Sequence, residues 1–167
     1  YRSDYFGQEE KSDGSPLTMA DTISNEIIMD ALKKISPDIS VVSEENFSDE
    51  NLKNLDETYW LVDPLDGTKE FIKKNGEFTV NIALIKNNYP IFGSVYAPYL
   101  KKLYWASEGL GSWKSENKKP ELQIFKKSNN KKIRIVISRS HPNEKVTDFI
   151  NQYDSYELIR MGSSLKI

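Results

Sequence analysis

Along the chain, the pattern of apolar and polar positions predicts one helix and then a succession of strands. A polar loop at residues 11–21 leads into a segment, 22–35, in which apolar residues recur with the period of an α-helix, and Ser36-Pro37 ends it. The apolar stripe of this amphipathic helix consists of Ile23, Ile27, Ile28, Ala31, Leu32 and Ile35. Thr18 or Asp21 is well placed to cap the N-terminus of the helix.

The remaining apolar segments have the character of strands. Residues 39–43 alternate and are rich in β-branched side chains, and residues 60–62 are bulky, as expected of a strand buried on both faces. Runs at 78–85, 91–97 and 102–106 follow at short intervals and predict an antiparallel sheet. Residues 133–138 predict a buried strand and residues 142–152 a helix, so we expect a second, α/β unit to begin there, with a domain boundary near Asn129.

Composition narrows the range of functions. With 167 residues and 38% hydrophobic content the chain can bury one core, and 25 acidic against 23 basic residues leave it nearly neutral. A nearly neutral chain gives no sign of a basic surface for nucleic-acid polymers. The lysines within 126–132 are more typical of a solvated loop than of a nucleic-acid-binding patch. No apolar run approaches the length of a membrane span, so we expect a soluble, cytoplasmic protein without stable membrane insertion.

Two carboxylates, those of Asp63 and Asp66, follow the predicted strand at 60–62 and flank a proline. Because Pro64 cannot donate a hydrogen bond to a neighbouring strand, we expect the strand to stop near Asp63 and the chain to turn. A turn would bring the two carboxylates towards one point, with the Leu65 carbonyl between them, and Mg²⁺ prefers such oxygen ligands. On these residues alone, an ordinary tight turn is an equally good interpretation.

The neighbouring segments add acidic groups and a candidate anion site. The strand at 39–43 runs into Glu44 and Glu45, one of which can join the same ion if the two strands are neighbours, whereas a solvated loop is the alternative. Gly67 and Thr68 begin a short predicted helix through Phe71, and the free amides of a helix N-terminus bind phosphate. The predicted cation and anion sites would lie side by side, as metal-assisted phosphoryl transfer requires.

Five motifs follow one another in a fixed order along the chain. They are Lys11-Ser-Asp-Gly-Ser-Pro-Leu-Thr-Met-Ala-Asp21, Val42-Ser-Glu-Glu45, Trp60-Leu-Val-Asp-Pro-Leu-Asp-Gly-Thr-Lys-Glu-Phe71, Gly76-Glu-Phe-Thr-Val-Asn-Ile-Ala-Leu84 and Gly162-Ser-Ser-Leu-Lys166. Together they resemble the inositol monophosphatase superfamily, and the resemblance runs from about Lys11 to the last residue. Within it, Asp66-Gly-Thr-Lys-Glu-Phe71 is similar to the motif of the CysQ-type 3′(2′),5′-bisphosphate nucleotidases.

The resemblance implies a fold and a set of metal ligands. The fold would be α+β, a layered α/β sandwich of the inositol monophosphatase and fructose-1,6-bisphosphatase type, with residues 1–129 as the metal-binding domain and 130–167 as the start of a truncated C-terminal domain. Glu44, Asp63 and the Leu65 carbonyl correspond to ligands of a first Mg²⁺, and Asp63 and Asp66 are shared with a second, in a set of two or three ions. A further aspartate of the family, in a Trp-Asp context, would follow Ile167.

The resemblance also implies catalytic and substrate-binding residues. Thr68 with Asp21 matches the pair that orients and deprotonates the attacking water. The substrate contacts would be Lys11, Gly67, Thr68, His141, Ser163 and Lys166. His141 precedes Pro142 where the predicted strand meets the helix, and a lone histidine there is also commonly structural or exposed.

The implied activity is a lithium-sensitive, Mg²⁺-dependent phosphatase of sulfur metabolism that removes the 3′-phosphate from adenosine 3′,5′-bisphosphate or its sulfated analogue PAPS. Inositol phosphates and fructose bisphosphate are the runner-up substrates, and an inactive metal- or nucleotide-binding fragment is the alternative from another class. The absence of cysteine and the position of the single histidine, far from the acids, argue against cysteine-phosphatase and phosphohistidine chemistry. The oligomeric state is left open, with a homodimer as one option.

Overall fold

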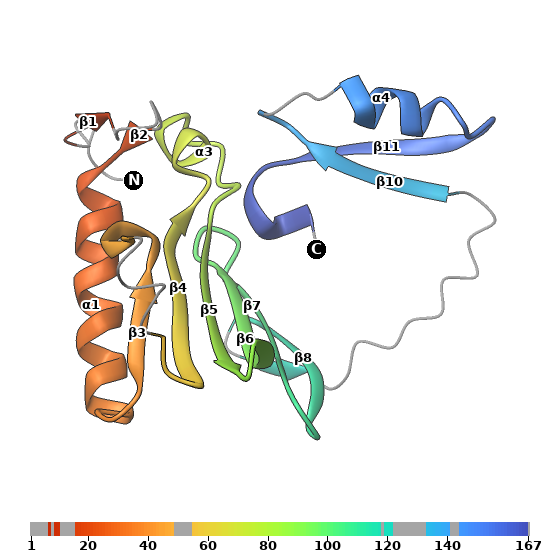
Figure 1. The fold of residues 1–167 in the computed structure, drawn as a ribbon. Helices are drawn as coiled ribbons and strands as arrows, with labels where there is room; N and C mark the ends of the chain where they lie inside the picture. The colour runs from red at the N-terminus through yellow and green to blue at the C-terminus, as the bar shows by residue number, and fades with distance from the viewer. Residues whose placement is uncertain are drawn as a thin grey trace.

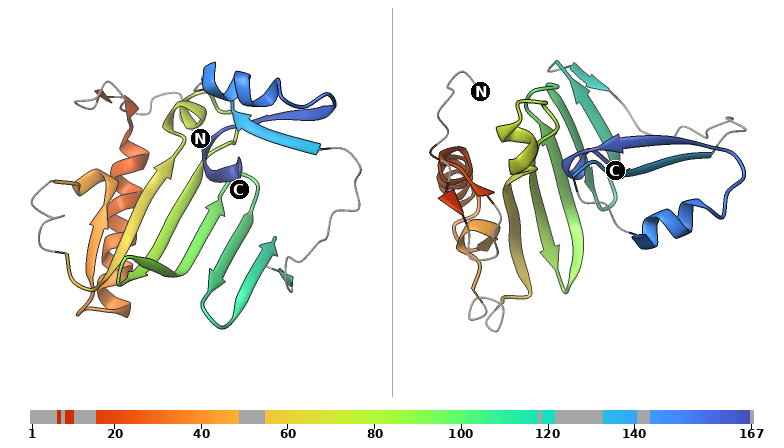
Figure 2. Two further views of the ribbon diagram at one scale, coloured as in Figure 1. Left: turned by 45° about the vertical axis from the view of Figure 1, so that its right-hand side comes forward. Right: turned by 90° about the horizontal axis from the view of Figure 1, so that it is seen from above.

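The structure, a computed structural model, consists of one large sheet and a smaller second unit. It describes residues 7, 9–10, 16–48, 55–117, 119–121, 133–140 and 144–166. Helix α1 covers one face of the large sheet, and the second unit lies on the side of the sheet away from α1 (Figures 1 and 2). The last turn of the chain curls from the second unit back towards the sheet (Figure 1).

The elements follow one another in an order close to the predicted one. They are β1 (Glu9–Glu10), β2 (Pro16–Leu17), α1 (Met19–Ile35), β3 (Ser40–Ser43), η1 (Glu44–Asn46), β4 (Thr58–Asp66), α3 (Thr68–Ile72), β5 (Thr79–Lys86), β6 (Tyr89–Ala97), β7 (Lys102–Ser107), β8 (Gly111–Glu116), β9 (Lys119–Glu121), β10 (Ile133–Ser138), α4 (Glu144–Ile150), β11 (Tyr156–Met161) and η2 (Ser163–Lys166).

The large sheet has the strand order β3-β4-β5-β6-β7-β8-β9. β3 and β4 pair in parallel, and each later neighbour pairs antiparallel, which confirms the predicted antiparallel run from residue 78 onward. The predicted strand at 133–138 and helix within 142–152 are present as β10 and α4, and β10 pairs in parallel with β11, a strand that was not predicted. The boundary predicted near Asn129 lies outside the described residues and stays a prediction, as do the lysines within 126–132.

Helix α1 was predicted correctly, but its packing face was predicted only in part. Thr18 caps the helix and Asp21 completes a capping box, so the backbone amides at the start of the helix have hydrogen-bond partners. The buried residues of α1 are Asp21, Asn25 and Leu32. Leu32 belongs to the predicted apolar stripe, whereas Ile23 and Ile27 of that stripe are 47% and 64% exposed. Polar partners hold this different face inward, since Ser43 Oγ donates to Asn25 Oδ1 at 2.7 Å.

Strand β4 differs from the prediction in two ways. It does not stop near Asp63 but continues to Asp66. The pairing of β4 with β5 shifts register between Asp63 and Asp66, so Pro64 lies where the pairing needs no backbone N–H donor. The strand is also not buried on both faces, since Val62 is 2% exposed and Leu61 is 45% exposed. The sheet face that carries Val62 is covered, and the face that carries Leu61 is open.

A small apolar core lies under the end of β4. Leu65, Phe71 and Phe78 are buried together, with Ala20 of α1 packed against them. The rings of Phe71 and Phe78 meet edge to face at 5.1 Å. This cluster fixes α3 against the end of β4 and the start of α1.

We expect Gly76→Ala to destabilise the fold and Gly93→Ala to leave it nearly unchanged. Gly76 has a φ of +80°, and an added Cβ would lie 2.2 Å from the Tyr99 ring. The left-handed backbone alone costs a residue with a side chain about 1 to 2 kcal/mol. Gly93 on β6 meets nothing within 4 Å. Urea unfolding of both variants measures the difference, and equal midpoints would show that the loop before β5 adapts freely.

Candidate active site

The ends of two neighbouring strands bring acidic side chains together. β3 and β4 pair in parallel with Ser43 opposite Val62, so Glu44 and Asp63 come next at the same edge of the sheet. The pKa of Asp63 is raised to about 7, chiefly by burial and then by the negative charges of Glu44 and Asp66. The three carboxylates are therefore near enough to repel one another.

Two oxygen atoms at this edge have no hydrogen-bond partner among the described residues. They are the buried Oδ1 atoms of Asp63 and Asn81, two residues that are paired across β4 and β5. Buried polar atoms are almost always hydrogen-bonded, so an exception calls for a specific explanation. A cation would satisfy such oxygen atoms, because both can only accept or coordinate.

Asp66 connects the sheet with the second unit. Ser164 Oγ donates to Asp66 Oδ2 at 2.7 Å, and Thr79 Oγ1 donates to the same oxygen at 3.4 Å. Asn81 Nδ2 in turn donates to Ser164 Oγ at 3.1 Å. The η2 turn is thus held at the ends of β4 and β5 by two side chains of the sheet.

Asp21 and Thr68, which were predicted as a pair, are in contact. Thr68 Oγ1 donates to Asp21 Oδ1 at 3.1 Å and lies 3.4 Å from the Leu65 carbonyl oxygen. The other Asp21 oxygen, Oδ2, accepts from the Thr18 amide at 2.8 Å and from the Thr18 hydroxyl at 2.6 Å. Asp21 is 1% exposed, so these donors replace the water that an ionised carboxylate would otherwise bind.

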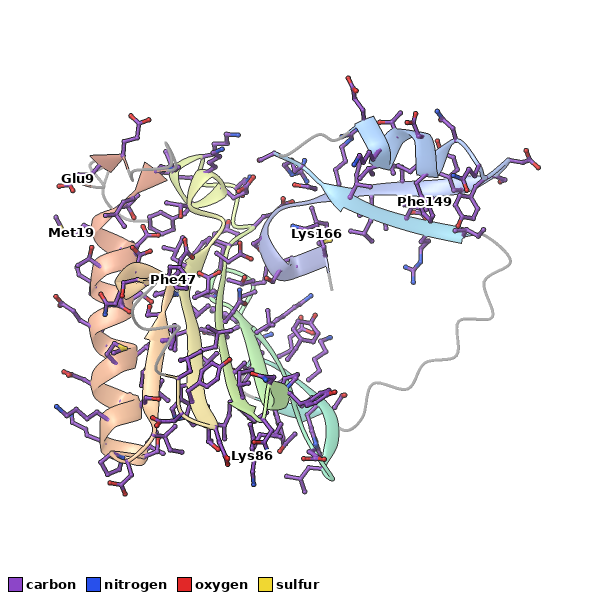
Figure 3. All side chains as sticks on the ribbon, viewed as in Figure 1. Glu9, Met19, Phe47, Lys86, Phe149 and Lys166 are labelled. Atoms are coloured by element: carbon purple, nitrogen blue, oxygen red, sulfur yellow. The ribbon has the colours of Figure 1, made fainter. Side chains whose placement is uncertain are left out.

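A cavity of about 240 Å³ opens beside these groups. The first wall of the cavity is formed by Pro16, Glu44 and residues 65–70. The second wall is formed by residues of the second unit, namely Ser138, Ser140, Gly162, Ser163 and Lys166. Figure 3 shows Lys166 on the η2 turn, between the sheet and the second unit. The cavity therefore lies where the two parts of the chain meet.

Gly67 is one point of close approach between the two walls. It precedes α3 with a φ of 92°, and a Cβ there would lie 3.0 Å from the Glu77 carbonyl oxygen and 3.0 Å from Ser163 Cβ. Both the backbone conformation and the space therefore require glycine. Lys166 Nζ donates to the Ser163 carbonyl, which holds the ammonium group at the second wall.

The remaining predicted residues have different outcomes. Lys11 and His141 lie outside the described residues. Glu45 does not line the cavity that Glu44 lines, and its amide bonds to Ser43 Oγ at 3.4 Å. Of the two glutamates after β3, Glu44 is therefore the one at the site.

Sequence reasoning missed three polar residues of the site, namely Glu70 and Ser140, which line the cavity, and Ser164, which bonds to Asp66. Glu70 is 3% exposed and accepts a hydrogen bond from the Ser140 hydroxyl. Its position in the first turn of the predicted helix at the anion site was a usable signal. Ser164 adjoins the predicted Ser163, but no spacing indicates that Ser164 rather than Ser163 reaches Asp66.

The donor set fits a divalent cation chemically, although the side chains are not grouped as ligands. Among the residues that the structure describes, no three acidic, histidine or cysteine side chains are spaced to hold a metal ion. Burial and the nearby negative charges of Glu44 and Asp66 disfavour the ionised form of Asp63, and a bound cation would offset that cost. The three carboxylates and the Leu65 carbonyl still offer only oxygen atoms, which suit Mg²⁺.

The sequence profile of the inositol monophosphatase family matches residues 1–166 of this chain. The chain belongs to the inositol monophosphatase family. The 3′(2′),5′-bisphosphate nucleotidase CysQ of Salmonella typhimurium is 45% identical over 166 residues, with 93% of this chain and 62% of the relative covered. The chain thus spans less than two thirds of the length of this curated relative.

Solved structures of the family share the fold. CysQ from Bacteroides thetaiotaomicron is 39% identical, with a TM-score of 0.79 over 93% of this chain and 64% of that one. An IMPase/NADP phosphatase complexed with Mg²⁺ and phosphate is 21% identical, with a TM-score of 0.74 over 95% of this chain and 59% of that one. The layered α+β fold of the inositol monophosphatase family is therefore confirmed. In the part of the chain that the structure describes, no helix is long and apolar enough to cross a membrane.

We expect Asp63→Asn to raise the thermal stability of the metal-free chain, and more so at about pH 8 than at about pH 5. A carboxyl group whose pKa is raised on folding favours the folded state at low pH and loses that contribution as the pH rises to about 7. The amide removes this loss. Asp30→Asn, at an exposed position of α1, is the matched control and should change the melting temperature equally at both values. A pH-independent effect of Asp63→Asn would contradict the repulsion described above.

Proposed function

We propose that the full-length protein is a Mg²⁺-dependent phosphatase that removes the 3′-phosphate from adenosine 3′,5′-bisphosphate, with the sulfated analogue PAPS as a second substrate. One observation carries the proposal: a single cavity is bordered by Glu44, Asp66 and Thr68 on one wall and by Ser163 and Lys166 on the other. Acidic groups for a cation and a basic group for an anion thus face the same space.

The substrate class rests on the relatives. The Salmonella typhimurium protein that is 45% identical is named a 3′(2′),5′-bisphosphate nucleotidase, and a CysQ structure shares the fold. The structure of the IMPase/NADP phosphatase was obtained with Mg²⁺ and phosphate, which supports the same ion here. Bound at Glu44, Asp63, Asp66 and the Leu65 carbonyl, the cation would neutralise charge on the transferred phosphoryl group.

In this proposal Thr68 and Asp21 accept the proton of the attacking water. Thr68 Oγ1 directs its hydrogen at Asp21 Oδ1, 3.1 Å away, so its lone pairs are free to accept a hydrogen bond from a water molecule. A proton leaving that water can pass through the Thr68 hydroxyl to Asp21. As the new oxygen–phosphorus bond forms, the bond between phosphorus and the sugar oxygen breaks without a covalent intermediate, and the departing oxygen takes a proton from solvent and leaves as a hydroxyl group.

The second wall binds and orients the phosphorylated substrate. Lys166 has three N–H donors, of which one is used by the Ser163 carbonyl, so the others can serve an anion. Ser163 is 8% exposed and adjoins Gly67, where α3 begins. A phosphate between these walls would be aligned with the Asp21–Thr68 pair, and alignment is a large part of catalysis of phosphoryl transfer.

The proposal is tested by phosphate release from the full-length protein. With Mg²⁺ it should hydrolyse adenosine 3′,5′-bisphosphate faster than inositol phosphates, lose activity with a chelator, and be inhibited by lithium. Equal or faster release from inositol phosphate would transfer the assignment to inositol monophosphatase activity. A folded protein that binds adenosine 3′,5′-bisphosphate but releases no phosphate from any ester would be a binding domain instead.

Thr68→Ala should reduce kcat by roughly 10²- to 10⁴-fold, the usual contribution of a positioned proton-transfer group. KM should change little, because the second wall and the carboxylates are untouched. Thr68→Ser keeps the hydroxyl and should retain most of the rate. Thr22→Ala, at an exposed position of α1, is the control. A Thr68→Ala enzyme with a normal kcat would remove Thr68 from the chemistry.

A further inference from the structure

One carboxylate outside the cavity receives three donors from the second unit. Glu77 lies in the segment between α3 and β5, and the donors follow β10 and β11. Arg139 Nε donates to Glu77 Oε2 at 2.7 Å and Arg139 Nη2 to Glu77 Oε1 at 2.7 Å, which is a bidentate pair. The Gly162 amide donates to Glu77 Oε2, also at 2.7 Å. Glu77 is therefore an anchor for the second unit.

The same contacts fix the segment that leads into η2. Arg139 Nη2 donates to the Arg160 carbonyl at 2.7 Å, which ties the guanidinium to the end of β11. A Cβ on Gly162 would lie 2.6 Å from Glu70 Cγ and 3.0 Å from the Glu77 carbonyl oxygen, so the backbone at Gly162 lies close against α3 and the segment before β5. A shift of a few tenths of an ångström at Gly162 would therefore move the residues after it.

Those residues form the second wall of the cavity. Ser163 and Lys166 follow Gly162 directly in η2, whereas Glu77 and Arg139 do not line the cavity. Ser163 Cβ would lie 3.0 Å from a Cβ on Gly67, so there is no room for a side chain between Gly67 and the second wall. The Asp21–Thr68 pair, in contrast, is held entirely by residues of the first part of the chain.

The ion pair is better suited to fixing geometry than to stabilising the whole fold. The Glu77 and Arg139 side chains are 20% and 44% exposed, and solvent screens such pairs. The planar guanidinium nevertheless determines direction as well as distance, because both of its bonds must be satisfied at once. Hydrogen bonds from Arg139 also hold the pKa of Glu77 below its ordinary value, so the carboxylate is charged at neutral pH.

We propose that Glu77 and Arg139 are positioning residues that hold Gly162–Lys166 against Gly67 and so set the phosphate-binding wall of the cavity. This inference rests on the proposed function, in that the ligand is a phosphate ester. The two walls of the cavity then respond differently to loss of the ion pair. Loss of the pair weakens substrate binding through the second wall, and the proton-handling pair on the first wall keeps its geometry.

The test uses Arg139→Gln in the full-length protein. KM for adenosine 3′,5′-bisphosphate should rise by about tenfold with kcat nearly unchanged, the signature of lost binding common to ground and transition states. Arg139→Lys keeps the charge without the bidentate geometry and should recover only part of the loss. Arg134→Gln, an exposed position on the same strand β10, is the control. Glu77→Gln is the second variant and should raise KM in the same direction.

Hydrogen exchange of the Gly162–Lys166 amides gives a readout that does not need turnover. Exchange should be faster in Arg139→Gln and in Glu77→Gln than in Arg134→Gln, and the affinity for inorganic phosphate should fall in parallel. If the wild-type protein hydrolyses no phosphate ester, the proposed function fails, and the exchange and phosphate measurements still decide the positioning role. Unchanged amide exchange together with unchanged KM or phosphate affinity would show that Glu77–Arg139 is only a surface ion pair.

Discussion

The parallel pairing of β3 with β4 is the constraint on which the candidate site depends. It carries Glu44 and Asp63 to one edge of the sheet, and the register shift after Asp63 adds Asp66. Three carboxylates at one edge repel one another, and burial of Asp63 adds a desolvation cost. The fold tolerates this arrangement because the core of Leu65, Phe71 and Phe78 holds the surrounding backbone. The electrostatically unfavourable cluster of acidic side chains is thus supported by a well-packed apolar core.

Asp21 shows how one residue can satisfy a structural and a chemical requirement together. One of its oxygens completes the cap of α1 through Thr18, and the other accepts from Thr68. The two interpretations available from the sequence, a helix cap and a member of the water-activating pair, are therefore compatible. Capping fixes the carboxylate in place, and that fixed position is what a hydrogen bond to Thr68 requires.

Local sequence signals predicted most of the elements, and long-range contacts account for what they missed. The turn residues and β-branched runs indicated β3 through β7, and Gly67 indicated the start of α3. The exposed Ile23 and Ile27 could not be foreseen, because the packing face of α1 is chosen by the bond between Asn25 and Ser43. The contacts of Glu77 could not be predicted either, because its partners lie 62 and 85 residues away in sequence. The residue pattern within one helix or strand contains no information on such distant contacts.

The bond between Ser164 and Asp66 spans 98 residues, and this distance in sequence has a consequence for how the protein assembles. Closing so long a loop is slow and entropically costly, whereas the hairpins from β5 to β8 close quickly. We therefore expect the acidic edge to form first during synthesis and to stay open on one side until β11 has emerged and docked. The wall of the cavity that Gly162–Lys166 provides would then be the last part of it to form.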